Sequence, residues 1–314
     1  MSGEVESVAR PIVAVVGPTA SGKSDLGIAL ALRLGGEVVN CDSVQVYREI
    51  ELATAKVPPH ERRGVPHHLI DFVPPEVRYT AADWARDALT VIDEIERRGR
   101  VAVLVGGTGF YLRALRDPLF EAPPTDGRLR GRLETLRGRR GPEHLHRLLG
   151  RLDPGSARRL NPRDWPRVQR ALEVRLQTGA PLSELRRDRP EPPPHAARMR
   201  VFALNPPREE LYRRINGRAG RHFEAGLVEE VRGLLARGVP AASSALGAHG
   251  YRRVVEYLRG ERTLESAVEQ TRFDVRHYAK RQLTWFRREP GVEWVEGFGE
   301  DPRVQEEVAR RLGL

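Results

Sequence analysis

Short apolar runs alternate with stretches of helical period along most of the chain. Four runs, at 12–16, 37–41, 101–105 and 200–204, are long enough for strands and have few polar interruptions. Runs of this kind are typical of parallel strands that are covered on both faces. Apolar residues at helical spacing lie between them, most clearly at 80–98. The alternation predicts an α/β fold with a doubly wound parallel sheet.

The pattern changes after residue 117. Between 118 and 198 strand-like runs disappear, and arginine-rich helical segments follow one another. Prolines mark both ends of the stretch, with Pro123-Pro124 near its start and RPEPPPH at 189–195. We therefore predict a helical insertion domain at 118–198, carried by a catalytic core formed from residues 1–117 and 199–314.

The chain after the fourth apolar run is predicted to be mainly helical. Helical patterns continue from 205 to 288, and a short strand (VEWV) follows at 292–295. An amphipathic helix completes the chain. The core thus has a helical C-terminal part.

The chain is strongly basic. Its 314 residues carry a formal net charge of +10, and the pI is near 10.4. Such a charge favours a polyanionic partner, nucleic acid ahead of an anionic membrane surface, although a genome that favours arginine has the same effect. No apolar run approaches the roughly 20 residues of a membrane helix, and the N-terminus does not resemble a signal peptide. With Cys41 as the single cysteine, we expect a cytoplasmic protein that does not enter a membrane. We also expect a monomer, because the patterned apolar faces all have a use within one chain.

Lysine is rare in this sequence, and its positions are therefore informative. Only Lys23, Lys56 and Lys280 are lysines among 53 basic residues. A compact, mobile ammonium cannot be replaced by a planar guanidinium in a tight phosphate site. Lys23 and Lys56 are thus candidate phosphate ligands, and Lys280 is a weaker candidate.

A glycine-bounded loop follows the first apolar run. It reads Gly17-Pro18-Thr19-Ala20-Ser21-Gly22-Lys23-Ser24, and a helical pattern comes next. In this context the spacing is the signature of a phosphate-binding loop, whose backbone N–H groups and helix N-terminus face an anion. We expect Lys23 to neutralise phosphate oxygens and the Ser24 hydroxyl to bind Mg²⁺.

The acidic residue that a motor ATPase or GTPase needs is missing from the expected place. Those proteins have an apolar strand that ends in a Mg²⁺-binding Asp, but the run at 101–105 ends in Gly106-Gly107-Thr108. The acid at a strand end is Asp42, and ligands of an open α/β sheet bind at the carboxyl ends of its strands. Asp42 is a candidate metal ligand or general base, with a helix N-cap as the alternative.

A set of short motifs follows in a fixed order: GPTASGKS, CDSVQVYREIELATAK, HHLIDFVPP, YTAADWARDA, LVGGTGFYLRAL, RALEV, GLVEEV, GYR and AKRQLTWFRR. In this order they resemble the bacterial tRNA dimethylallyltransferase family, over about residues 11 to 295. One segment departs from the family, whose usual Ile-Gly-Thr-Ala-Lys-Pro reads Leu-Ala-Thr-Ala-Lys-Val at 52–57. The departure concerns the local turn and keeps Thr54 and Lys56.

The resemblance implies a P-loop NTPase-like fold and a prenyl transfer. The reaction would move a dimethylallyl group from dimethylallyl diphosphate to N6 of adenosine 37, beside the anticodon, in tRNAs that read codons starting with U. The loop would then hold a leaving diphosphate, and Lys23, Mg²⁺ on Ser24 and, by resemblance, Arg218 would stabilise its growing charge. Lys56 is included among the predicted diphosphate ligands.

The resemblance also assigns the acceptor side. Asp42 matches the family's general base, and Thr108 matches a residue that contacts the target adenosine, which must leave its stack to reach the site. The segment 276–288 interleaves aromatic residues with cations such as Arg281, and we expect the aromatics to be core and some cations to bind RNA. The implied tRNA contacts, which also include Arg281, are Asp42, Ser43, Val44, Gln45, Thr108, Arg130, Pro166, Arg167, Val168, Gln169, Arg170, Gly247, Ala248, His249, Gly250, Tyr251 and Arg252.

Two other enzyme classes remain open from the sequence. One is the same chemistry on free adenine nucleotides, which the basic insertion argues against because a free nucleotide does not need it. The other is a P-loop small-molecule kinase, whose mobile, arginine-bearing lid the insertion could imitate. An RNA-binding module with a vestigial phosphate loop is the non-enzymatic alternative.

Overall fold

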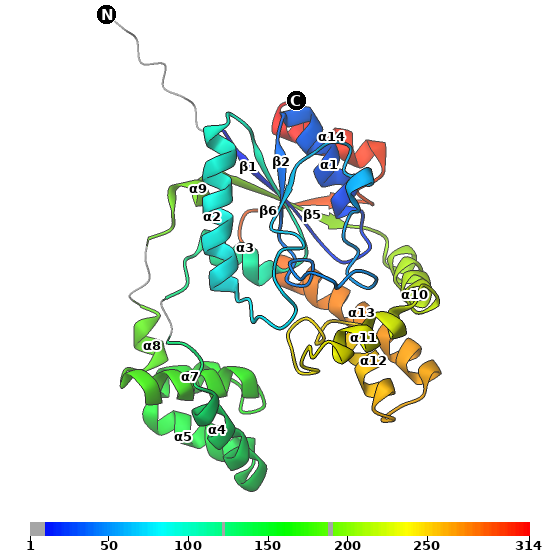
Figure 1. Ribbon diagram of the computed structural model, residues 1–314. Coiled ribbons are helices and arrows are strands. Elements are labelled where there is room, and N and C mark those ends of the chain that lie inside the picture. The colour runs from blue at the N-terminus through cyan, green and yellow to red at the C-terminus, as the bar shows by residue number, and fades with distance from the viewer. Residues whose placement is uncertain (1–9, 121–122, 188–190) are drawn as a thin grey trace, which may run out of the picture. The chain divides into compact units, whose positions relative to one another are not determined.

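The computed structural model describes residues 10–120, 123–187 and 191–314. The chain divides into two compact units. The core unit comprises the described residues up to Arg116 and those from Pro193 to Leu314, and the helical unit spans Asp117–Pro192. Each unit has a hydrophobic core of its own, and Figure 1 shows the elements of both.

The core unit contains a six-stranded sheet in which every pair of neighbouring strands is parallel. The strand order β3-β2-β4-β1-β5-β6 confirms the predicted doubly wound sheet. The four apolar runs are the four central strands, and β6 is the predicted VEWV strand. The strands are β1 (Ile12–Val16), β2 (Glu37–Asn40), β3 (His67–His68), β4 (Ala102–Val105), β5 (Met199–Asn205) and β6 (Val292–Glu296).

Helices cover both faces of this sheet (Figure 1). On one face lie α1 (Lys23–Leu34) and α14 (Pro302–Leu312), which pack against each other and share a cluster of buried residues with the strands. On the other face α2 (Ala81–Arg97) packs against α3 (Gly109–Arg116), and α3 packs against α9 (Pro194–Ala197). A capping box between Thr80 and Asp83 begins α2, as this pairing commonly does.

Four further helices complete the core unit. They are α10 (Arg208–Glu224), α11 (Leu227–Ala236), α12 (Tyr251–Leu258) and α13 (Leu264–Phe286), and a short 3₁₀ turn, η1 (Pro59–Glu61), lies earlier in the chain. The expectation of continuous helix from 205 to 288 is wrong between 238 and 250, where the chain forms turns. Gly238 and Gly250 adopt positive φ and Pro240 lacks an N–H donor, so helix cannot continue there.

The helical unit consists of short helices around a leucine-rich core. Leu145, Leu149, Val168 and Leu172 are fully buried in it. Its end at Pro192 comes before the predicted 198, because α9 belongs with α3 in the core unit; residues 189–190 of the closing proline-rich segment lie outside the described part. The helices are α4 (Gly127–Arg140), α5 (Pro142–Leu152), α6 (Pro154–Arg159), α7 (Trp165–Thr178) and α8 (Leu182–Leu185).

Among the described residues, no helix has both the length and the apolar character needed to cross a bilayer.

Candidate active site

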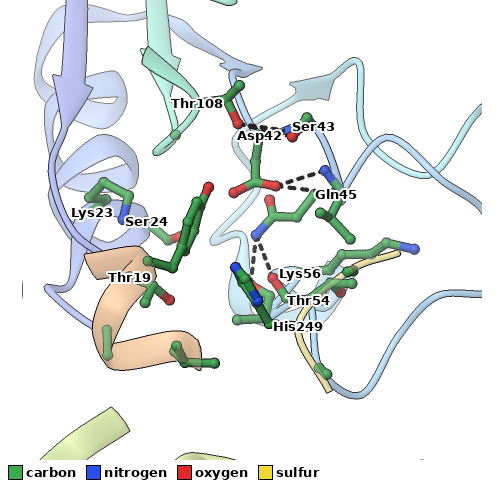
Figure 2. A pocket seen from close by; sticks show the side chains of 18 of the residues that line it. Thr19, Lys23, Ser24, Asp42, Ser43, Gln45, Thr54, Lys56, Thr108 and His249 are labelled. Atoms are coloured by element: carbon green, nitrogen blue, oxygen red, sulfur yellow. Dashed lines mark hydrogen bonds between the residues drawn. The ribbon is translucent and has the colours of Figure 1, made fainter. Parts of the chain in front are cut away.

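A large cavity of about 1230 Å³ lies in the core unit. Its walls come from the loops that follow β1, β2 and β4, together with α10, α13 and the turns at 244–249. It thus lies at the carboxyl edge of the sheet, where open α/β folds bind their ligands. In Figure 2, Thr19, Lys23 and Ser24 lie on one side of this space, and Ser43, Gln45 and Thr54 lie on the other.

The phosphate-binding loop connects β1 to α1. Gly22, its last residue, adopts φ 78°, and a Cβ there would lie 2.0 Å from a carboxylate oxygen of Glu300. Because Gly22 is also the N-cap of α1, no side chain caps the first turn of that helix. The first-turn N–H groups therefore remain available to an anion, and the helix dipole favours one at this end. This geometry fits the loop's predicted role.

Lys23 is the first residue of α1 and reaches back over the loop. Its Nζ donates a hydrogen bond to the carbonyl oxygen of Pro18 at 2.6 Å. Desolvation inside the cavity lowers the pKa of Lys23 to about 8; Asp42 opposes this shift and Arg218 adds to it. An anionic ligand next to Lys23 would stabilise the protonated amine and raise its pKa again.

Arg218 reaches the same loop from α10. Its Nη2 donates to the Thr19 hydroxyl at 2.8 Å, although 199 residues separate the two along the chain. Desolvation lowers the pKa of Arg218, and Arg221 adds to that effect. The next titratable neighbour, His222, has its pKa lowered to about 4 by burial and by the two arginines, so its imidazole is neutral at pH 7. The positive charge here therefore comes from Lys23 and the arginines.

Asp42 follows β2 directly. Its Oδ1 accepts backbone hydrogen bonds from Val44 at 2.9 Å and from Gln45 at 3.4 Å. Residues 43–46 form turns and not a helix, so the carboxylate caps a turn in place of the helix considered from the sequence. It lines the cavity together with Lys23 and Ser24, where it can serve as a base or reach a metal ion.

Thr108 stands beside Asp42 because β2 and β4 are neighbours in the sheet. The Thr108 Oγ1 accepts a hydrogen bond from the Ser43 N–H at 3.0 Å, and the Thr108 N–H donates to the Cys41 carbonyl at 3.2 Å. A Cβ on Gly106 would lie 2.0 Å from that same carbonyl oxygen. Gly106 thus lets the two loops touch, and Thr108 and Asp42 become parts of one wall.

Gln45 connects this wall to the segment that departs from the family pattern. Its Nε2 donates to the carbonyl oxygens of Thr54 and Ala55, at 2.9 and 3.1 Å. Ala55 adopts φ 54°, in the left-handed region. The altered 52–57 turn therefore forms in this chain, and it is held by a side chain.

Lys56 is placed differently from the expectation of a diphosphate ligand. Its Nζ donates to the carbonyl of Tyr47 at 2.7 Å and pairs with Asp71 and Glu51 at 2.7 and 2.8 Å. These acceptors use its three donors, its side chain is only 6% exposed, and Figure 2 shows it leading away from Lys23. A phosphate contact would require one of these bonds to be given up, so Lys56 here stabilises the loops around it.

The predicted tRNA residues of the core unit fall into two groups. Gly247, Ala248 and His249 line the cavity, where the His249 ring lies 4.9 Å from the Tyr278 ring. Tyr251 is fully buried and donates to Glu230, so its side chain is structural, and Gly250 before it is also buried. Arg252 and Arg281 are exposed, and Arg252 pairs with Glu256.

The predicted tRNA residues of the helical unit lie on α4 and at the start of α7. Arg130 makes a two-pronged pair with the buried Glu173, at 2.7 and 3.0 Å, and Arg170 bonds the same carboxylate and the Pro123 carbonyl. Pro166 and Arg167 are exposed. Val168 and Gln169 are buried in the unit's own core, unlike their neighbours Pro166 and Arg167, and their contact with tRNA stays a prediction. They fall on the inward face of α7.

The aromatic residues of 276–288 differ in their placement. Phe286 is buried, as predicted for core. Trp285 packs under Arg113, whose Cζ lies 4.3 Å from the ring centroid, and against Phe110. Tyr278 lines the cavity, and desolvation raises the pKa of its hydroxyl. A single stacking platform does not form along this helix.

Gln282 and Glu300 are among the cavity residues that were not predicted from the sequence. Gln282 lies on the α13 face that also carries Thr271, Val275 and Tyr278, and this 4-3-4 spacing in the sequence is the signal that could have found it. Glu300, which pairs with Arg214, comes from the loop before α14, and no local pattern marks it.

The protein donors at this site could bind Mg²⁺ only if a substrate supplied further oxygen ligands. Ser24 and Asp42 offer oxygen ligands to the same cavity, but within the described residues no group of three or more His, Cys, Asp or Glu could hold an ion alone. A Mg²⁺ ion commonly uses one or two protein oxygens and completes its shell with phosphate and water. The residues present fit that arrangement.

Comparisons with known proteins show which family the chain is similar to. The model of the IPP transferase family matches residues 45–289. A protein from Solibacter usitatus named tRNA dimethylallyltransferase is 48% identical over 302 residues, which cover 96% of this chain and 98% of that one. One from Geobacter metallireducens with the same name is 49% identical, covering 91% and 92% of the two chains.

Solved structures agree with the sequence relatives. The tRNA isopentenylpyrophosphate transferase of Bacillus halodurans superposes with a TM-score of 0.69 at 37% identity, covering 97% of both chains. A eukaryotic dimethylallyltransferase, described as acting on tRNA, gives a TM-score of 0.79 at 26% identity, covering 97% of this chain and 78% of the other.

Proposed function

The chain belongs to the IPP transferase family, and we propose that it transfers a dimethylallyl group from dimethylallyl diphosphate to N6 of adenosine 37 in tRNAs reading codons that start with U. It is a tRNA dimethylallyltransferase, as are its relatives by name. The observation that carries the finer proposal is the placement of two different walls around one cavity. The phosphate loop with Lys23 and Arg218 forms one wall, and Asp42 with Thr108 forms the other.

The phosphate-loop wall would hold the leaving group. In the transfer a bond forms between N6 and C1 of the dimethylallyl group, while the bond between C1 and the diphosphate oxygen breaks. Negative charge grows on that oxygen, so the α1 N–H groups, Lys23 and Arg218 stabilise the transition state more than the ground state. Mg²⁺ on Ser24 would supply further neutralisation of the diphosphate oxygens.

The opposite wall would activate the acceptor. The exocyclic amine of adenine is a poor nucleophile because its lone pair is delocalised into the ring. Asp42 would accept the N6 proton as the new bond forms, and Thr108 would orient the flipped base beside it. The Val44 and Gln45 N–H groups hold the Asp42 Oδ1, which fixes the orientation of the carboxylate.

The proposed function is tested by supplying both substrates with matched alternatives. Purified protein receives labelled dimethylallyl diphosphate with unmodified tRNA, with tRNA whose position 37 is guanosine, or with AMP. Label should enter only the first RNA and should map to A37. Transfer to AMP would indicate the free-nucleotide reaction, and transfer of γ-labelled phosphate from ATP to a small acceptor would indicate a kinase. Either result without RNA labelling contradicts the proposal.

The cellular location and the oligomeric state of the enzyme are parts of the same proposal. We propose a cytoplasmic enzyme that acts as a monomer on the anticodon stem-loop, since both cavity walls come from one chain. Sedimentation with and without tRNA should show one protein per RNA.

A further inference from the structure

A buried glutamine joins the two walls of the cavity. Gln282, on α13, is 4% exposed. Its Oε1 accepts a hydrogen bond from the backbone N–H of Thr19 in the phosphate loop at 2.8 Å, and its Nε2 donates to the carbonyl of Gly107 at 3.1 Å. A backbone N–H can only donate and a carbonyl can only accept, so these two partners fix the orientation of the amide.

Each partner leads directly to a group of the proposed chemistry. On one side, the Thr19 hydroxyl accepts a hydrogen bond from Arg218 at 2.8 Å. On the other side, Gly107 precedes Thr108, whose Oγ1 accepts from the N–H of Ser43 at 3.0 Å, and Ser43 follows Asp42. One amide thus stands in the middle of a continuous series of contacts from the diphosphate side to the acceptor side.

The fit around this amide is tight. A Cβ at Gly107 would lie 2.0 Å from the Nε2 of Gln282, so this glycine lets the backbone approach the side chain. The hydrogen bond to the Thr19 N–H is partly buried, and the hydrogen bond to the Gly107 carbonyl is buried. If the amide were lost, a donor and an acceptor would lose their partner inside the protein, which is costlier than losing an exposed hydrogen bond.

We propose that Gln282 is a positioning residue that sets the distance between the leaving diphosphate and the acceptor amine. The inference rests on the proposed function, because it concerns the separation of the two reacting groups. Reacting atoms must stand about 3–3.5 Å apart in a productive complex, and a misplacement of about 1 Å can cost roughly 10²-fold in rate. Gln282 acts through the two loops, because its amide hydrogen-bonds the backbone of both.

Removing the amide should lower kcat and leave substrate affinity nearly unchanged. Gln282→Met keeps the length of the side chain and removes both hydrogen bonds. We expect kcat to fall by about 10- to 100-fold, with the KM for dimethylallyl diphosphate and for tRNA within about threefold of the parent. The matched control is Gln270→Met on the same helix, since Gln270 bonds Asp274 at 3.0 Å and lies outside the cavity lining. This control should keep the parent's kcat.

Gln282→Glu tests the Gly107 contact alone. A carboxylate still accepts from Thr19, but an ionised oxygen repels the Gly107 carbonyl, whereas a protonated one donates to it. Burial raises the pKa of a glutamic acid, so the ratio of variant to parent kcat should rise as pH falls from about 8 to about 6. The charged side chains that face the cavity, among them Lys23, Asp42 and Arg218, are the same in both proteins, as is Tyr278. A flat ratio would overturn the assignment of the Nε2–Gly107 bond.

Hydrogen exchange separates this inference from the proposed function. In Gln282→Met, and not in Gln270→Met, the backbone amide of Thr19 should exchange faster, whether or not the parent transfers dimethylallyl. If the parent is inactive but shows this exchange pattern, the proposed reaction is contradicted, while the link that Gln282 makes between the two loops is supported. A Gln282→Met protein with the parent's kcat, or one that only melts earlier or only binds dimethylallyl diphosphate more weakly, would show that Gln282 does not set the distance.

Discussion

At the residue scale, the site depends on cations that have been taken out of water. Lys23 and Arg218 both have their pKa lowered by desolvation, an arrangement that becomes favourable when an anion arrives. The loop motif and the rarity of lysine were enough to find Lys23. The same rarity led to Lys56, which instead pairs with Asp71 and Glu51, because a compact ammonium suits carboxylate partners as well as it suits a phosphate.

Replacing Lys23 with arginine should abolish most activity although the charge is kept. The Lys23 Nζ lies 2.6 Å from the Pro18 carbonyl, and a planar guanidinium on the same short path would occupy the space of the diphosphate. We expect steady-state transfer to fall by at least about 10²-fold, with the thermal midpoint nearly unchanged. Turnover by the arginine variant at the parent's rate would show that only the charge of Lys23 matters.

The affinity for dimethylallyl diphosphate should weaken as pH rises through about 8. Lys23 in the free protein loses its proton near that pH, and binding the anion then requires the proton to be taken up again. Calorimetric titration from about pH 7 to about pH 9 should show Kd rising by up to about tenfold. In Lys23→Ala, which binds more weakly throughout, this pH dependence should disappear; an equal rise in both proteins would assign it to another group.

Asp42→Asn separates a base from a metal ligand. The amide keeps the shape of the carboxylate and can still accept from Val44, but it cannot take up the N6 proton. Rapid-mixing single-turnover measurements at saturating substrates should show a loss of roughly 10²–10⁴-fold, with diphosphate affinity retained. Weaker diphosphate binding that high Mg²⁺ restores would instead make Asp42 a metal ligand, and retained turnover would exclude both roles.

At the element scale, the two walls of the cavity lie close together because the loops that carry them follow neighbouring strands at the carboxyl edge of the sheet. The apolar runs predicted the central strands because buried parallel strands are apolar throughout, whereas β3 is the polar pair His67–His68 and carries no such signal. The turns at 238–250 were missed because their helix-like periodicity outweighed Gly238, Pro240 and Gly250. Those turns supply His249 to the cavity, so the error concealed part of the site. Gln282 was missed for another reason: its partners are 175 and 263 residues away.

Gly106→Ala should disturb the contact between the β2 and β4 loops. Its Cβ would lie 2.0 Å from the Cys41 carbonyl oxygen, which is backbone and cannot rotate away. Overpacking of this kind costs about 1–3 kcal/mol, and Thr108 should shift with the turn. Thermal unfolding should show a lower midpoint, and transfer should fall more than stability predicts. Gly233→Ala on α11 is the control, since its Cβ has ordinary room and alanine favours helix; equal effects of the two changes would refute the steric argument.

At the scale of the whole molecule, the positive charge is unevenly divided. Residues 117–192 carry 17 arginines and 11 acidic residues, so six of the ten net charges belong to a quarter of the chain. The loss of strand-like runs after residue 117 predicted the start of the helical insertion correctly. Its end was placed at 198, since sequence alone does not show that α9 packs on α3. The pattern also could not show that Val168 and Gln169 face inward, because that depends on how α7 packs in the helical unit.

Replacing residues 119–191 with a short Gly/Ser linker should separate tRNA binding from diphosphate binding. The core unit has its own hydrophobic cluster and contains the whole cavity, so the shortened protein should fold and bind dimethylallyl diphosphate as the parent does. Arginine contacts to phosphates release counterions, and log K therefore falls linearly with log salt with a slope set by their number. We expect the shortened protein to lose most tRNA affinity and to show a flatter slope from about 50 to about 200 mM salt. Loss of affinity with an unchanged slope would mean that the helical unit acts by shape and not by charge. A folded, shortened protein that binds tRNA as tightly as the parent would show that the anticodon stem-loop is held by the core unit alone, through exposed residues such as Arg252 and Arg281.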